Sequence, residues 1–142
     1  MNYWLVKSEP VKYPWDKFVK DGQACWDGVR NYAARNNLRA MKKGDLVLYY
    51  HSNEGLDIVG IAKVKTESYQ DPTTEETAWL AVDLVPFKKL KKSVTLPVVK
   101  SDALLKEMQL VKLSRLSVAA VTKEQFDRVL ELGGDVVGLY RK

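Results

Sequence analysis

The sequence has very few of the side chains that bind transition metals or form covalent cross-links. Its 142 residues include one cysteine, Cys25, and one histidine, His51. A single cysteine cannot form an internal disulfide, and a four-ligand zinc site needs several cysteine or histidine ligands. We therefore expect no metal site built from these ligands and no cofactor. A reduced Cys25 fits a reducing, intracellular compartment.

Long hydrophobic runs are also missing. The first apolar run, from Tyr3 to Val6, ends at Lys7 after four residues, whereas a secretory signal has an apolar core of about 7–15 residues. Nowhere does the chain approach the roughly 18 apolar residues of a membrane-spanning helix. These absences predict no membrane partner and a cytoplasmic location, nucleoid-associated in a bacterium and nuclear in a eukaryote.

Motifs of the common catalytic and nucleotide-binding sites are absent as well. The chain contains no Gly-x-Ser-x-Gly, no P-loop, no dinucleotide fingerprint and no His-Glu-x-x-His. Nothing in the spacing of Cys25 and His51 supports a thiolate–imidazole dyad, so a small buried thiol and a hydrogen-bonded histidine are the simpler interpretation. The sequence thus does not predict an enzyme.

What the sequence does contain is basic charge gathered in two places. The formal net charge is +5, from 23 Lys and Arg against 18 Asp and Glu. Residues 30–43 and residues 88–100 each carry five basic side chains and no acid. Such clustering predicts attraction to a polyanion such as nucleic acid. The second segment is either another contact or a solubilising strand edge. The first supplies the candidate phosphate-binding residues Arg30, Arg35, Arg39, Lys42 and Lys43.

Apolar runs with strand-like patterns dominate the middle of the chain. Connections between them are too short for helical crossovers, so we expect antiparallel pairing in a small, strongly bent sheet or barrel. Pro97 marks the last run as an edge strand. The predicted strands cover residues 3–8, 46–50, 58–64, 79–85 and 94–99.

Helical spacing of apolar residues occurs at both ends of the chain. It predicts helices after Pro14, over residues 31–41, from Ser101 to Met108 and from Thr122 to Gly133. Thr122 and Gln125 have the spacing of a capping box. Strands and helices in this order predict an α+β domain over residues 1–134 with a loosely attached C-terminal tail over residues 135–142.

Aromatic residues are plentiful, with four tryptophans and seven tyrosines. Trp26 is followed by the turn signal Asp27-Gly28. A planar ring beside hydrogen-bonding groups at a loop suits a nucleobase, which stacks on the face of the ring and is recognised at its edge. Trp26 is therefore a candidate binding residue. Structural packing is the preferred interpretation for Trp4, Trp15 and Trp79.

Five sequence blocks follow one another over nearly the whole chain. They lie at residues 4–10, 26–36, 50–52, 69–73 and 115–118. The second block, Trp-Asp-Gly-Val-Arg-Asn-Tyr-Ala-Ala-Arg-Asn, is long and specific, and the others gain weight from their order. Together they resemble the EVE domain family, a branch of the PUA-like superfamily. The resemblance implies a PUA-like bent antiparallel β-barrel decorated with helices.

The resemblance also implies a nucleic-acid reader. EVE domains are similar to YTH domains, which accept a methylated adenine in an aromatic cage, and are associated with modified cytosines in DNA. By position, Lys7, Ser8 and Glu9 would form a pocket wall and Trp26 would supply a stacking face. The other residues implied to line or support the base-binding pocket are Asn31, Tyr50, His51, Arg115 and Ser117.

Base extrusion is the mechanism that these observations predict. The basic segment 30–43 binds phosphates, a nucleotide carrying a modified base rotates out of its stack, and the base enters the pocket beside Trp26. Ser8, Asn31 or His51 would hydrogen-bond its edge. The sequence does not identify an effector protein that acts on the recognised base.

Two alternatives stay open. The PUA-like superfamily also contains small amidohydrolases that act on acylated cytidine, for which Lys7, Ser8 and Glu9 would have to converge. In a strand, Lys7 and Glu9 share one face and Ser8 lies on the other, which disfavours convergence. The second alternative is an RNA-binding module that ignores base modification.

Overall fold

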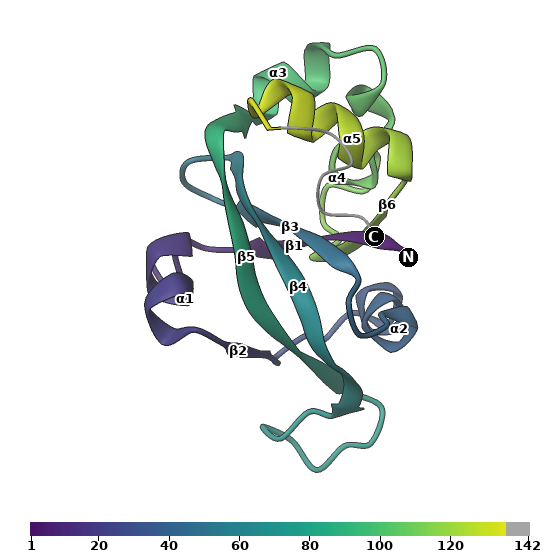
Figure 1. Ribbon diagram of the computed structural model, residues 1–142. Helices are drawn as coiled ribbons and strands as arrows, with labels where there is room; N and C mark the ends of the chain where they lie inside the picture. The colour runs from purple at the N-terminus through teal and green to yellow at the C-terminus, as the bar shows by residue number, and fades with distance from the viewer. Residues whose placement is uncertain (136–142) are drawn as a thin grey trace.

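A computed structural model describes residues 1–135 of the chain. One bent six-stranded sheet with the strand order β2-β5-β4-β3-β1-β6 forms its centre, and helices surround it (Figure 1). The elements in chain order are β1 (Tyr3–Ser8), α1 (Trp15–Asp21), β2 (Ala24–Trp26), α2 (Tyr32–Ala40), β3 (Leu46–His51), β4 (Asp57–Gln70), β5 (Leu80–Thr95), α3 (Leu96–Ser101), the 3-10 turn η1 (Leu105–Glu107), α4 (Gln109–Lys112), β6 (Val118–Val121) and α5 (Lys123–Leu132).

The long hairpin of β4 and β5 gives the sheet its shape. The two strands have 14 and 16 residues, and their antiparallel register shifts at several points, the first between Ile58 and Gly60. Such irregularities bend a strand and increase its twist. The hairpin therefore crosses the whole molecule, with α3 and α5 near one end and the loop of residues 71–79 at the other (Figure 1).

The predicted α+β class is confirmed, as is antiparallel pairing of β3, β4 and β5. One pair differs, because β1 runs parallel to β3 and antiparallel to β6. The chain between β1 and β3 passes through α1, β2 and α2, and a connection of this length permits a parallel crossover. Over the described residues the sheet remains open, with β2 and β6 at its edges.

The prediction for residues 94–108 was wrong in detail. β5 continues to Thr95, and the predicted edge strand is instead helix α3, with Pro97 in its first turn. Proline is tolerated there because the N–H groups of the first turn have no intrahelical acceptor. Ser101 ends this helix rather than beginning another, and the predicted helix from Ser101 to Met108 is represented by the 3-10 turn η1.

Two helix ends formed as the sequence predicted. Asn31 caps α2, since its side-chain oxygen accepts a hydrogen bond from the N–H of Ala34 at 2.9 Å. Thr122 and Gln125 make the predicted capping box at α5, with bonds of 3.0 and 3.1 Å. Both caps join residues three positions apart, which is why local sequence was sufficient to find them.

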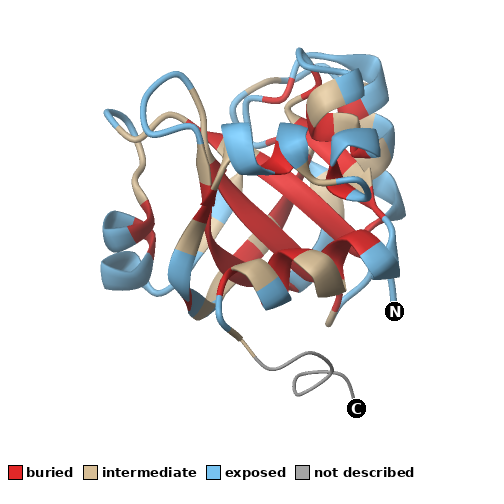
Figure 2. Ribbon diagram, turned by 90° about the horizontal axis from the view of Figure 1, so that it is seen from above, coloured by how far each residue is buried: buried red, intermediate tan, exposed pale blue. Residues whose placement is uncertain are grey.

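Buried residues concentrate in the strands at the centre of the molecule and alternate with exposed ones along the helices (Figure 2). Tyr49 on β3 is fully buried and lies at the centre of an aromatic cluster that also contains Trp15, Phe18 and Trp26. Its ring centroid is 5.1 Å from that of Phe18, 5.3 Å from that of Trp15 and 5.6 Å from that of Trp26. This cluster joins the hydrophobic core to Trp26.

Little of the predicted tail falls within the described part of the chain. Asp135 donates its N–H to the carbonyl oxygen of Leu130 at 2.8 Å, and residues 136–142 lie outside the described residues. The domain boundary at residue 134 stays a prediction. Among the described helices, none combines the length and the apolar character that crossing a bilayer requires.

Gly60 lies where Trp15 packs across β4. A Cβ atom at this position would lie 2.6 Å from Cη2 of Trp15, and Trp15 is itself held against Tyr49. We expect Gly60→Ala to lower the free energy of unfolding by about 1–3 kcal/mol, the usual cost of overpacking. Urea denaturation measures this, with Thr66→Ala on the exposed part of β4 as a control that changes stability by less than about 0.5 kcal/mol. Equal losses in the two variants would contradict this packing.

Candidate functional site

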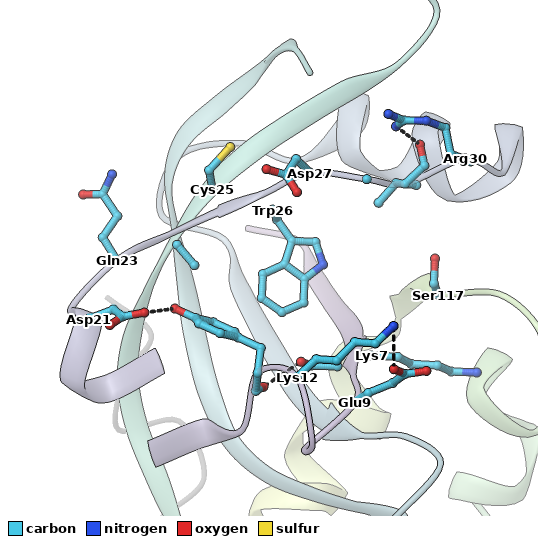
Figure 3. A pocket seen from close by; sticks show the side chains of 15 residues that line it. Lys7, Glu9, Lys12, Asp21, Gln23, Cys25, Trp26, Asp27, Arg30 and Ser117 are labelled. Carbon is cyan, nitrogen blue, oxygen red and sulfur yellow. Dashed lines mark hydrogen bonds and ion pairs between the residues drawn. The ribbon is translucent and has the colours of Figure 1, made fainter. Parts of the chain in front are cut away.

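A cavity of about 690 Å³ opens beside the end of β1. Its volume falls within the roughly 300–1,000 Å³ that is typical of small-molecule sites. The lining comes from the end of β1 and the turn after it, the end of α1, strand β2 with the loop that follows, and Ser117. Segments far apart in the sequence thus meet around one space (Figure 3).

Trp26 projects from β2 into this cavity (Figure 3). Its backbone pairs with Val82 of β5, and its half-buried ring meets the rings of Tyr49 and Tyr13 edge-on, at interplanar angles of 77° and 67°. The indole N–H has no hydrogen-bond partner among the described residues. The ring is therefore fixed from behind by the aromatic cluster and retains an open surface and a donor toward the cavity.

The hydroxyl of Ser8 makes a structural hydrogen bond inside the protein. It is buried, and its hydroxyl donates to the carbonyl oxygen of Tyr13 at 2.7 Å. The hydroxyl of Tyr49 donates to the same oxygen, also at 2.7 Å. The N–H of Tyr13 in turn donates to the carbonyl oxygen of Glu9 at 2.8 Å. Ser8 thus anchors the turn after β1 and brings Tyr13 to the cavity.

The cavity wall contains a cation, Lys7, and an anion, Glu9. Nζ of Lys7 donates to the carbonyl oxygen of Ser114 at 2.6 Å, and burial lowers the pKa of Lys7. Glu9 accepts a hydrogen bond from Asn53 at 2.5 Å and pairs at 3.1 Å with Lys12. Because Lys12 is largely exposed, its ion pair with Glu9 can open to a ligand. The wall therefore offers both donors and acceptors.

Asp71 fixes the loop that follows Trp26. This buried carboxylate accepts hydrogen bonds from the N–H of Gly28 at 2.8 Å, from Nη1 of Arg30 at 2.9 Å, and from the N–H and hydroxyl of Thr73 at 2.7 and 2.6 Å. Burial alone would raise the pKa of Asp71, but the hydrogen bonds from Thr73, Arg30 and Gly28 outweigh it and hold the pKa well below the ordinary range. The carboxylate thus ties the Trp26 loop to the loop of residues 71–79.

The structure brings some of the predicted pocket residues together around the cavity. Two others, Asn31 and Arg115, line a neighbouring groove with Leu113 and Ser114. Because Lys7 binds the backbone of Ser114, it lies between the cavity and this groove. The predicted residues that line the cavity itself are Lys7, Ser8, Glu9, Trp26 and Ser117.

Tyr50 and His51 lie on β3, outside the cavity lining. Tyr50 is buried. Nε2 of His51 accepts a hydrogen bond from the N–H of Trp15 at 3.1 Å. Burial lowers the pKa of His51, and the charges of Asp57 and Asp16 oppose this only in part. A neutral His51 supports α1 and the aromatic cluster.

The predicted phosphate-binding residues divide into paired and unpaired cations. Arg30 is paired with Asp71 at 2.9 Å, and Lys42 lies 3.9 Å from Glu67. The cations without a carboxylate partner among the described residues are Arg35, Arg39 and Lys43. Those three therefore have charge to offer to a phosphate.

The lysine-rich segment of residues 88–100 lies mostly on β5. Within residues 1–135, strand β2 pairs with β5 only at residues 82–84 and no other strand lies on that side of β5. The lysines lie beyond this pairing, where the N–H of Lys92 donates to the carbonyl oxygen of Gly133 at 3.0 Å. Lysines on an unpaired edge prevent strands of other molecules from pairing there. This arrangement favours the solubilising interpretation.

Several lining residues were missed by the sequence interpretation. Tyr13 is the most consequential, because its ring meets Trp26 and its hydroxyl donates to Asp21 at 3.0 Å. The Glu9-Pro10 turn was the available signal, since a chain that reverses there returns to the end of β1. The other missed lining residues with charged side chains are Lys12, Asp21 and Asp27.

Known proteins are similar to this chain over most of its length. The model of the EVE domain family matches residues 2–132. Mouse thymocyte nuclear protein 1 is 37% identical, over 92% of this chain and 73% of that protein. A solved protein of Agrobacterium tumefaciens has a TM-score of 0.93 and 46% identity, over 95% of this chain and 94% of that one.

A further solved relative contains nucleic acid. Human thymocyte nuclear protein 1 in complex with DNA containing 5-methylcytosine has a TM-score of 0.88 and 34% identity, over 96% of this chain and 99% of that one. The PUA-like fold that the sequence resemblance implied is confirmed by these similarities. With the family model matching nearly all of the described residues, the chain belongs to the EVE domain family.

Proposed function

We propose that this protein is a reader that binds nucleic acid carrying a modified base, specifically a modified cytosine in DNA. The observation that carries the proposal is the cavity into which Trp26 projects, with its ring fixed by Tyr49 and Tyr13. A preorganised aromatic surface beside polar groups suits a flat heterocycle. Support also comes from the related human protein, which was solved with DNA containing 5-methylcytosine.

Recognition would begin with phosphate contacts. Arg35, Arg39 and Lys43, which lack carboxylate partners within residues 1–135, supply sequence-independent affinity that falls as salt rises. A nucleotide then leaves its stack, which costs a few kcal/mol, and part of this cost is recovered when the base stacks on Trp26. Arg30 and Lys42 would add weaker phosphate contacts, because each already lies near an acid.

Inside the cavity, the wall groups would recognise the edge of the base. The Glu9 carboxylate can accept a hydrogen bond from the exocyclic amino group of cytosine, a pairing that proteins use in DNA recognition. The free N–H bonds of Lys7 and the hydroxyl of Ser117 can donate to the ring nitrogen and carbonyl oxygen. Ser8, Tyr50 and His51 would act by supporting this wall from behind, and Asn31 and Arg115 by binding the adjoining backbone in their groove.

A carbon substituent on the base would be read by apolar contact with the ring of Trp26. One added methyl group in an apolar site changes binding by about 1–3 kcal/mol. We therefore propose a modest preference for the modified base and a larger, modification-independent affinity from the phosphates. The proposed partner also implies a location with access to nucleic acid, which is the nucleoid region of the cytoplasm in a bacterium or the nucleus in a eukaryote.

The amidohydrolase alternative has less support. Lys7, Ser8 and Glu9 are each engaged with a different part of the chain, namely Ser114, Tyr13 and the pair of Lys12 and Asn53. A nucleophile and its base must lie within hydrogen-bond reach of each other. Incubation with an acylated cytidine and chromatographic analysis of the products tests this alternative, and we expect no deacylation.

A binding titration tests the reader proposal. Fluorescence anisotropy would compare labelled oligonucleotides of one sequence that differ only in one base, with 5-methylcytosine or plain cytosine, as DNA and as RNA. We expect tighter binding of the modified DNA by roughly 5- to 150-fold, the range of one apolar contact, at every salt concentration. Equal affinity for modified and plain strands would overturn the proposal and favour the modification-blind RNA-binding module.

A further inference from the structure

Tyr32 is an aromatic side chain left 60% exposed at the first position of α2. Its ring lies on that of Trp79, with centroids 4.9 Å apart and planes inclined by 30°. The guanidinium of Arg35 lies 5.1 Å from the centre of the Tyr32 ring, and that of Arg30 lies 5.6 Å from the centre of the Trp79 ring. We call these four side chains the arginine–aromatic stack.

The stack is held rigidly by the loop of residues 71–79. Nη1 of Arg35 donates to the carbonyl oxygen of Ala78 at 2.7 Å, and the indole N–H of Trp79 donates to Glu76 at 3.0 Å. Arg30 is fixed by its bonds to Asp71 and Thr73. Groups that are already ordered lose little conformational freedom when a ligand binds them.

Exposure and charge distinguish this stack from the packing of the core. Trp79 is 9% exposed and serves as a base for the stack, whereas Tyr32 is largely open to solvent. Arg35 is part of the stack and, within residues 1–135, has no carboxylate partner. Planar groups that carry uncompensated positive charge are the surface on which nucleobases stack beside their phosphates.

Arg30 connects the stack to the cavity. Its side chain lines the cavity that contains Trp26 and also lies over Trp79. Asn31, the residue between Arg30 and Tyr32, lines the groove next to the cavity. The stack is therefore continuous with the proposed base-binding site and lies at its rim.

We propose that the arginine–aromatic stack binds the nucleotide next to the one in the cavity. The base of that neighbour packs against the part of the Tyr32 ring that Trp79 and Arg35 leave open, and the Arg35 charge faces its phosphate. This inference rests on the proposed function, since it assigns a second subsite to the same nucleic acid. The second subsite contributes affinity without reading the modification, because the modified base lies elsewhere.

A length comparison tests the subsite. The ligands are the free nucleoside 5-methyl-2′-deoxycytidine and single-stranded DNA of five nucleotides with either 5-methylcytosine or cytosine at its centre. We expect Tyr32→Ala to weaken binding of both oligonucleotides by about five- to tenfold, as for the loss of one stacked base, and to leave nucleoside binding unchanged.

Two further variants are controls for this experiment. Tyr32→Phe keeps the ring and should bind like the parent protein. Phe87→Ala removes another exposed aromatic ring, away from the cavity lining, and should change nothing.

A second measurement changes the DNA instead of the protein, so its result does not depend on whether the Tyr32→Ala variant folds. Replacing the bases flanking the central 5-methylcytosine by abasic sites should weaken binding as much as Tyr32→Ala does, and combining the two changes should cause little additional loss. Unchanged oligonucleotide binding by Tyr32→Ala would overturn the subsite, as would an equal loss for the free nucleoside. If modified and plain oligonucleotides bind equally but Tyr32→Ala weakens both, the subsite stands and the proposed reading of modification fails.

Discussion

Replacing Trp26 by alanine is expected to abolish the preference for modified over plain nucleic acid. The indole ring is the only aromatic surface of β2, and it projects into the cavity while Tyr49 and Tyr13 hold its edge. Loss of one stacking surface for a base costs about 1–3 kcal/mol, or roughly 5- to 150-fold in Kd. In the anisotropy titration, Kd for the modified oligonucleotide should rise by this amount and Kd for the plain one by less, so that the ratio of the two values approaches one.

Two controls separate recognition from folding in this experiment. Trp26→Phe retains a smaller stacking face and should retain part of the preference, whereas an unfolded protein would lose binding to both strands. Thermal unfolding of Trp26→Ala should still be cooperative, because the ring is only half-buried and Tyr49 remains packed on Phe18. A Trp26→Ala protein that still prefers the modified strand would remove Trp26 from the site.

Asp71→Ala should be among the most destabilising single substitutions in this chain. It removes the acceptor of four hydrogen bonds, including those from the backbone N–H groups of Gly28 and Thr73 and from Arg30. Donors left without partners near the protein interior, together with a lost ion pair, cost about 2–4 kcal/mol. Urea denaturation measures the loss. Glu75→Gln removes an exposed charge in the same loop and should change stability by less than about 0.5 kcal/mol.

The Asp71 carboxylate should also make the free energy of unfolding decrease as pH falls into the acidic range. Because the folded protein holds the pKa of Asp71 below its ordinary value, the unfolded chain takes up the proton more readily. The stabilisation is complete above the unfolded pKa of about 3.9 and is lost as pH falls from there toward the folded pKa. The unfolding free energy of the parent protein should therefore fall more steeply below about pH 4 than that of Asp71→Asn. Parallel curves for the two proteins would contradict this role.

Loss of Asp71 should also weaken binding. The carboxylate joins the Trp26 loop to the loop that carries Trp79, and so it positions both the cavity and the arginine–aromatic stack. A positioning residue of this kind affects modified and plain strands together, whereas Trp26 affects their ratio. Measuring Kd for the modified and the plain strand, and the ratio of the two values, for both Asp71→Ala and Trp26→Ala distinguishes the two roles.

Features that depend on neighbouring residues could be predicted from the sequence. The Asn31 cap and the Thr122 and Gln125 capping box each join residues three positions apart. The apolar strands of the central sheet are likewise recognised from patterns that span a few residues. Trp26 could be singled out for the same reason, since the turn signal that exposes it follows immediately. Local patterns are ambiguous where one residue type fits two structures, as Pro97 does in an edge strand and in a first helical turn.

Features that depend on contacts across the chain could not be predicted in this way. The sequence showed Ser8 as a hydroxyl beside Lys7 and Glu9, but its partner is the carbonyl oxygen of Tyr13. It showed Arg30 as one of five similar cations, but the distant Asp71 neutralises it. Trp79 was correctly assigned to packing, yet its packing partner Tyr32 is itself exposed.

The sequence by itself determined the α+β class, the family resemblance, the basic segment 30–43 and the choice of Trp26 as a candidate binding residue, because each depends on residue types at short spacing. Only the tertiary structure decided that, of the implied pocket residues, Asn31 and Arg115 line a separate groove and that Arg35 has no carboxylate partner within residues 1–135. The physical reason is that these relations depend on strand register and on hydrogen bonds between residues about forty positions apart, such as Gly28 and Asp71. Strand register and long-range hydrogen bonds are not specified by the residues adjacent to either of the two groups that meet.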